Sequence, residues 1–204
     1  MEPKRIIVAG IGTEVGKTVV SAILVETLKA DYWKPVQSGD LHHTDTMKVS
    51  SWISNEKSVF HPEGVRLQEP MSPHAAADLE NITIKPSNLS VPVTNNDLII
   101  ELAGGLMVPI NHGYLNIDFI ADLGYLVVLV SQYYLGNINH TLMSWNLLRE
   151  RNIPFLGFIF NGNKNDATFE VILVYTKSKC LLEVNQEDQI DKATIRKYAT
   201  SFKL

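Results

Sequence analysis

Short apolar runs alternate along the chain with longer segments in which apolar residues recur at helical spacing. This alternation is typical of a parallel β-sheet covered by helices. Most of the apolar runs are nearly continuous, as a strand buried on both faces requires. The predicted strands are residues 5–9, 32–36, 97–103, 125–131 and 155–161.

Seven segments carry a helical pattern. Segment 55–96 is the least regular and holds five of the nine prolines, so we expect loops and short helices over one end of the sheet. The pattern predicts one domain, residues 1–204, with a three-layer α/β/α fold and a mainly parallel central sheet. Ligands of such sheets bind beyond the carboxyl ends of the strands. The predicted helices are residues 17–30, 45–54, 73–79, 117–123, 139–152, 166–177 and 188–202.

Composition narrows the range of partners. The 204 residues carry 18 Lys and Arg against 22 Asp and Glu, without a dense basic run, which argues against nucleic-acid binding through phosphate contacts. The one cysteine, Cys180, excludes an internal disulfide and a Cys-rich zinc site. Apolar residues 6–9 are too short a run for a signal peptide, and no run approaches the ~18 residues of a membrane span. We expect a cytoplasmic protein with a small-molecule partner.

A glycine-rich sequence, Gly10-Ile-Gly-Thr-Glu-Val-Gly-Lys-Thr18, follows the first predicted strand and leads directly into a helical pattern. Backbone N–H groups of such a turn bind phosphate oxygens, and the helix N-terminus adds its positive end. Lys17 places an ammonium between phosphates, and the Thr18 hydroxyl can bind Mg²⁺. Five residues rather than the usual four separate Gly10 from Gly16. We interpret the segment as a nucleotide-binding P-loop rather than a glycine turn that precedes Gly-Lys-Thr by chance.

Two carboxylates could complete a metal site. Glu101 lies among apolar residues near the end of a predicted strand, where an unpaired charge is costly. Next to a P-loop, such an acid is a candidate metal ligand, and a salt-bridged glutamate is the alternative. Asp45 lies just before a helical segment, where an aspartate by itself is more often a helix N-cap than a metal ligand.

Two further anion sites are indicated at the same edge of the sheet. Lys34 and Ser38 follow the second predicted strand, where the lysine could stabilise a developing negative charge or extend along the surface. Segment 135–140 opens a long helix whose free N–H groups could bind a substrate carboxylate, although an ordinary helix start is the alternative. Segment 69–74 is expected to cap a short helix, and a simple turn that contains two prolines is the alternative.

Five blocks in order closely resemble the dethiobiotin synthetase family, over about the first 165 residues. They are Gly-x-x-Thr-Glu-Val-Gly-Lys-Thr at 10–18, Lys-Pro-Val-x-Ser-Gly at 34–39, Glu-Pro-x-Ser-Pro-His at 69–74, Glu-x-Ala-Gly-Gly at 101–105 and Leu-Gly-x-Ile-Asn-His at 135–140. The resemblance implies a P-loop NTPase-like homodimer that converts 7,8-diaminopelargonate, CO₂ and ATP, with Mg²⁺, into dethiobiotin, ADP and phosphate.

Site residues follow from the resemblance by matching position. It implies catalytic roles for Lys17, Lys34, Thr13 and Ser38. It implies that Thr18, Asp45 and Glu101 surround Mg²⁺, and that Ser38, Gly104, Gly136 and Asn139 bind substrate, with Glu14, Gly136 and Asn139 meeting its far end across the dimer interface. It implies a nucleotide site formed by Gly12, Thr13, Glu14, Val15, Gly16, Lys17, Thr18 and Val19, with Asn161 at the adenine.

The sequence departs from the family pattern at three places, and two other functions stay open. Leu102 replaces a usual Gly, Gly12 replaces a frequent acid, and segment 179–186 lacks a Gly-x-x-Pro type turn. The chain could therefore be a degenerate nucleotide-binding module. The ATPase switches of partitioning and cell division share the fold, but their loop has a second lysine where this chain has Gly12.

Overall fold

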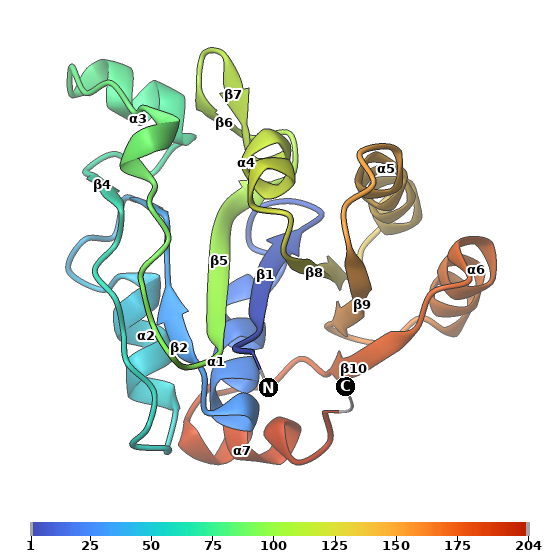
Figure 1. Ribbon diagram of the computed structural model, residues 1–204. Helices are drawn as coiled ribbons and strands as arrows, with labels where there is room; N and C mark the ends of the chain where they lie inside the picture. Colours follow the sequence, from blue (N-terminus) through green and yellow to red (C-terminus); the bar gives the residue numbers. More distant parts are fainter. Residues whose placement is uncertain (1, 203–204) are drawn as a thin grey trace.

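The computed structural model describes residues 2–202. Its centre is a six-stranded parallel sheet with the strand order β10-β9-β8-β1-β5-β2 (Figure 1). The strands are β1 (Arg5–Gly10), β2 (Asp31–Trp33), β5 (Leu98–Gly105), β8 (Leu126–Gln132), β9 (Phe155–Asn161) and β10 (Cys180–Val184).

Helices cover both faces of this sheet. On one face, α1 (Lys17–Leu28), α2 (Asp45–Trp52) and α7 (Lys192–Ala199) pack over Ile6, Val8 and Ile99. On the other face, α4 (Asn116–Leu123), α5 (Asn137–Glu150) and α6 (Asp166–Thr176) pack over alternate residues of the same strands, such as Ile7 and Ile100. The α/β/α layering predicted from the apolar runs is confirmed.

Short elements that are not part of the main sheet lie beyond its carboxyl edge. Strands β3 (Val36–Ser38) and β4 (Val65–Leu67) form a parallel pair, and β6 (Pro109–Asn111) and β7 (Tyr114–Leu115) form a hairpin. Helix α3 (Pro73–Leu79) packs against β3, β4 and β6, and a 3₁₀ turn, η1, covers Pro86–Asn88. Segment 55–96 therefore consists of loops and short elements, as its prolines indicate.

The prediction of one continuous strand over residues 32–36 is wrong. Strand β2 ends at Trp33, and β3 begins at Val36 and pairs with β4 instead of β5. Pro35 lies at the break and has no N–H to donate to a neighbouring strand. Its carbonyl instead accepts a hydrogen bond from Val65 N at 2.9 Å. The chain therefore turns away from the main sheet directly after Lys34.

The C-terminal part also differs from expectation. Strand β10, at the edge of the sheet, was not predicted from the sequence. The last helix begins at Lys192 rather than at 188, because the Asp191 side chain caps it by accepting a hydrogen bond from Thr194 N at 2.8 Å. Helix α5 begins at Asn137, two residues before the predicted start at 139, after Gly136 in a left-handed conformation (φ 106°).

The order of the strands creates a switch point at β1. Strand β1 pairs with β5 on one side and with β8 on the other, so the chain connections diverge at its carboxyl end. Clefts of open α/β sheets form at such points. The glycine-rich loop follows β1 and lies at this point.

Among residues 2–202, no helix is long and apolar enough to cross a membrane.

Candidate active site

The glycine-rich loop joins β1 to α1 in the geometry of a phosphate cradle. Gly16 precedes α1 with φ 93°, and Glu14 also has a left-handed backbone (φ 58°). The Lys17 ammonium curls back over the loop and donates to Gly12 O at 2.8 Å. Burial, assisted by the nearby Lys34 charge, lowers the pKa of Lys17 to about 8. The loop thus presents N–H groups and one desolvated cation at a helix N-terminus.

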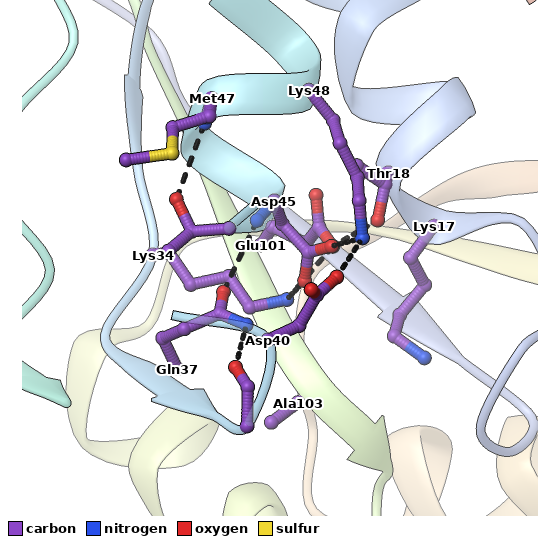
Figure 2. A network of polar contacts seen from close by, with 12 residues as sticks. Lys17, Thr18, Lys34, Gln37, Asp40, Asp45, Met47, Lys48, Glu101 and Ala103 are labelled. Atoms are coloured by element: carbon purple, nitrogen blue, oxygen red, sulfur yellow. Dashed lines mark hydrogen bonds and ion pairs between the residues drawn. The ribbon is translucent and has the colours of Figure 1, made fainter. Parts of the chain in front are cut away.

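A buried cluster of charges lies beside the loop. The Lys34 ammonium lies 2.5 Å from Asp45 Oδ2 and 2.9 Å from Glu101 Oε1, and Figure 2 shows it between the two carboxylates. Thr18 Oγ1 donates to the same Glu101 oxygen at 2.9 Å. Glu101 and Lys34 are 1% and 4% exposed, so this pairing satisfies charges that burial would otherwise make costly.

The charges shift each other's protonation equilibria. Burial works to raise the pKa of Asp45, but the charge and hydrogen bond of Lys34 outweigh it and hold the pKa below its usual value. Burial works to lower the pKa of Lys34, and Glu101 and Asp45 together raise it above the ordinary value. Asp45 and Lys34 therefore both stay charged around neutral pH.

Sequence reasoning missed two residues at this cluster, Tyr32 and Lys48. The buried Tyr32 hydroxyl donates to Glu101 Oε2 at 2.9 Å, and burial followed by the Glu101 charge raises the pKa of Tyr32 well above its usual value. Lys48 reaches from α2 to Asp40 Oδ2 at 2.8 Å and lies 3.7 Å from Asp45 Oδ1 (Figure 2). Tyr32 resembles an ordinary apolar strand residue, and Lys48 a solvated helix lysine, so the sequence carried no signal for either.

A cavity of about 730 Å³ opens over the cluster and the loop. Most of the site residues predicted from the sequence line it, although they come from four separate segments of the chain. The Ser38 hydroxyl is buried and has no hydrogen-bond partner among the described residues. The predicted residues that line this cavity are Thr13, Glu14, Gly16, Lys17, Thr18, Val19, Lys34, Ser38, Asp45, Glu101 and Gly104.

A second cavity of about 680 Å³ lies on the other side of Thr13. Its walls are mostly apolar and come from the segment after β5 and from α5. The P-loop residues Gly12 and Thr13 line part of this cavity. Glu150, on α5, contributes a carboxylate to its lining. The apolar lining residues are Ile11, Leu106, Met107, Val108, Met143 and Leu147.

The remaining predicted residues lie outside the first cavity. Asn161 lies at the end of β9. Its side-chain amide donates a hydrogen bond to Val15 O at 3.1 Å and so contacts the backbone of the P-loop. Gly136 and Asn139 lie at the start of α5 and are exposed. Within residues 2–202, no group of three or more His, Cys, Asp and Glu side chains is placed to hold a metal. A metal here would need hydroxyl or phosphate oxygens besides the two carboxylates.

Similarity to known proteins decides the family. Residues 4–194 match a protein family described as an AAA domain. The chain is 47% identical to the ATP-dependent dethiobiotin synthetase of Christiangramia forsetii over 98% of this chain and 97% of the relative. It is 44% identical to the enzyme of that name from Cytophaga hutchinsonii, over 96% and 95%. The chain belongs to the dethiobiotin synthetase family.

Membership in the dethiobiotin synthetase family confirms the resemblance carried by the five sequence blocks. It also confirms the prediction that the chain is an ATP-binding ligase of biotin biosynthesis, which forms carbon–nitrogen bonds. The similarity spans nearly the whole chain, so it extends through the C-terminal segment in which the resemblance fades.

Solved structures confirm the P-loop fold alone. A ParA family ATPase from Chlorobium tepidum superimposes with a TM-score of 0.61 at 12% identity, over 98% of this chain and 99% of that one. The cell division ATPase MinD of Pyrococcus furiosus gives 0.61 at 12% identity, over 96% and 97%. At such identities, the likeness to these two ATPases is one of fold.

Proposed function

We propose that this chain closes the ureido ring of dethiobiotin from 7,8-diaminopelargonate, CO₂ and ATP. One amine of the diamine forms an N–C bond with CO₂ and loses a proton, which gives a carbamate anion. A carbamate oxygen attacks the γ-phosphorus, and the bond to the β-phosphate oxygen breaks to release ADP. The second amine then attacks the carbamoyl carbon, loses a proton and displaces phosphate.

The buried cluster around Lys34 is the observation that carries the proposal. Negative charge builds up in every step, and preorganised cations stabilise it best where water is excluded. Lys34 lies in the same cavity as the P-loop, with Glu101 and Asp45 to keep it charged. We assign Lys34 to the carbamate and the transferred phosphoryl group, with Ser38 and Thr13 as hydroxyl donors beside it. The unpartnered hydroxyl of Ser38 supports this role.

Lys17 and the loop residues bind the triphosphate. The low pKa of Lys17 reflects its burial and the nearby charge of Lys34, and a phosphate anion would offset both. We assign Gly12, Glu14, Val15, Gly16 and Val19 to the same phosphate cradle, which extends from β1 into α1. Asn161 already lies against the loop at Val15, and we place the adenine on its side of the site.

Mg²⁺ fits the donor set beside the loop. Thr18, Asp45 and Glu101 offer one hydroxyl and two carboxylates, the hard oxygen donors that Mg²⁺ prefers, and the Thr18 and Glu101 oxygens are 2.9 Å apart. Few protein ligands suffice because Mg²⁺ usually keeps phosphate oxygens and waters. When bound, Mg²⁺ supplies charge neutralisation at the β- and γ-phosphates.

The second cavity suits the aliphatic part of the substrate. It adjoins Thr13 and is lined mainly by apolar side chains, so a carbon chain that starts at the reacting amines can continue into it. We place Gly104 next to the amines, since it lies close to Thr13. We assign Gly136 and Asn139, at the N-terminus of α5, to the substrate carboxylate of the opposite subunit in a homodimer.

Phosphate release tests the activity directly. The purified protein is assayed with MgATP, and diaminopelargonate and bicarbonate are added together and singly. We expect release only when both are present, with one phosphate per dethiobiotin. A nucleotide-binding module would show no stimulation, and an ATPase switch would hydrolyse ATP without the diamine.

The proposal also includes a single domain over residues 1–204, which limited proteolysis followed by size-exclusion chromatography can test. It further includes a cytoplasmic location, which cell fractionation can test.

A further inference from the structure

Tyr32 contacts the active site from within the core. It lies in β2, where it pairs with Ile99 of β5, and its side chain is completely buried. Side chains two residues apart on a strand share a face, so Glu101 lies on the same face of β5 as Ile99, the partner of Tyr32. Lys34 follows directly after β2, and its ammonium reaches Glu101 Oε1 at 2.9 Å. The Tyr32 hydroxyl donates to Glu101 Oε2 at 2.9 Å.

The two oxygens of Glu101 have different partners. Oε1 accepts from Thr18 Oγ1 and from the Lys34 ammonium, each at 2.9 Å. Oε2 accepts from the Tyr32 hydroxyl. The terminal torsion of a glutamate is broad and roughly two-fold, so packing of the stem alone does not fix the plane of the carboxylate. Donors on both oxygens do fix it.

The ring of Tyr32 has a separate task from its hydroxyl. It packs against Phe60 with a centroid distance of 6.0 Å and belongs to the apolar cluster beneath α1 and α2. A phenylalanine would keep these contacts and remove one donor. The hydroxyl therefore serves the orientation of Glu101, and its contribution is separable from that of the ring.

We propose that Tyr32 is a positioning residue of this enzyme, which holds the Glu101 carboxylate so that Oε1 faces Thr18 and Lys34, where it would be available as a metal ligand. This inference rests on the proposed role of Glu101 as a magnesium ligand. Partners that orient a metal ligand in this way typically contribute about 10- to 100-fold to metal affinity or activity. The hydroxyl is one neutral donor, so we expect an effect near the lower end.

The experiment compares Tyr32→Phe with a matched control, Tyr198→Phe. Tyr198 is also buried, and its hydroxyl also bonds a glutamate, Glu187, but it lies in α7 away from the cavity. Mn²⁺ binding to the protein with ADP is measured by electron paramagnetic resonance, which requires no turnover. The Mg²⁺ concentration for half-maximal phosphate release, the KM for diaminopelargonate and the melting temperature are measured in parallel.

We expect Tyr32→Phe to weaken Mn²⁺ binding and raise the half-maximal Mg²⁺ concentration about tenfold. The KM for diaminopelargonate should change less than about twofold, and Tyr198→Phe should change neither metal measure. If Tyr32→Phe lowers the melting temperature but leaves the metal affinity unchanged, the hydroxyl contributes only to stability. That result would overturn the proposal.

Glu101→Gln separates this proposal from the one on which it rests. If Glu101→Gln weakens Mn²⁺ binding and Tyr32→Phe does not, the positioning role of Tyr32 is refuted and the metal role of Glu101 stands. If Glu101→Gln leaves Mn²⁺ binding unchanged, the proposed role of Glu101 as a metal ligand is refuted, and the positioning role of Tyr32 is refuted with it. In the double variant, Tyr32→Phe should add nothing to the effect of Glu101→Gln, because it acts through that carboxylate. Additive effects would overturn the proposal.

Discussion

Replacement of Lys34 by methionine tests the electrostatic account of the site. The substitution nearly preserves the volume of the side chain and removes a charge that is 4% exposed. It leaves Glu101, 1% exposed, and Asp45 facing each other without their shared cation. Removal of one partner from a buried ion pair typically costs about 3–5 kcal/mol, because the remaining charge stays desolvated.

The expected loss can be read from thermal unfolding. For a domain of this size, 1 kcal/mol corresponds to about 2–4 °C in the melting temperature. Lys34→Met should therefore melt about 6–20 °C below the wild type at pH 7.5. Lys164→Met is the matched control, since Lys164 pairs with Glu183 at 3.1 Å on an exposed surface. The control should melt within a degree or two of the wild type.

The sign of the pH dependence provides a second check. In the wild type, the pKa of Asp45 is lowered on folding, so its contribution to stability is present above the unfolded pKa and is lost as pH falls through the folded pKa. Without Lys34, burial should instead raise the folded pKa of Asp45. The native variant then binds more protons than its unfolded state, and it gains stability as pH falls from about 7 towards 4.

The difference between Lys34→Met and the wild type should therefore shrink on acidification. Addition of Glu101→Gln to Lys34→Met should recover part of the lost stability, since it removes one of the two facing charges. A loss below about 1 kcal/mol at pH 7.5, or a loss that is constant between pH 5 and 8, would refute the reasoning.

Three further predictions concern the reaction. Lys17→Ala should abolish diamine-dependent phosphate release because the cation that follows the γ-phosphate is lost, and retention of more than about a tenth of the rate would remove Lys17 from the mechanism. Asp45→Asn and Glu101→Gln should each raise the half-maximal Mg²⁺ concentration in the same assay while unfolding stays cooperative, and an unchanged Mg²⁺ response would leave both residues with structural roles. Asn139→Asp should raise the apparent KM for diaminopelargonate far more than that for ATP, and mixing it with Lys17→Ala should restore some activity if each site needs both subunits. Full activity of a monomer, or subunit exchange without recovery, would contradict the shared site.

The sequence by itself determined the local features of this protein. The P-loop is one contiguous segment between a strand and a helix, so its position and chemistry follow from neighbouring residues. Apolar periodicity likewise predicted the layered fold, because burial on two faces leaves continuous runs in the strands. The prediction from apolar periodicity failed at Pro35, which has no N–H to donate, so that the following strand β3 pairs with β4 instead of continuing β2. It also failed to predict β10, a short strand at the edge of the sheet.

Only the tertiary structure decided which charges meet. Glu101 lies 67 residues from Lys34 and 69 from Tyr32, and they become neighbours because β5 inserts between β1 and β2. Strand order is set by the packing of the whole sheet, and no local pattern specifies it. The same packing buries Lys17 and lowers its pKa to about 8. A residue such as Tyr32 reads as core in the sequence, and only the fold reveals that its one polar atom touches the active site.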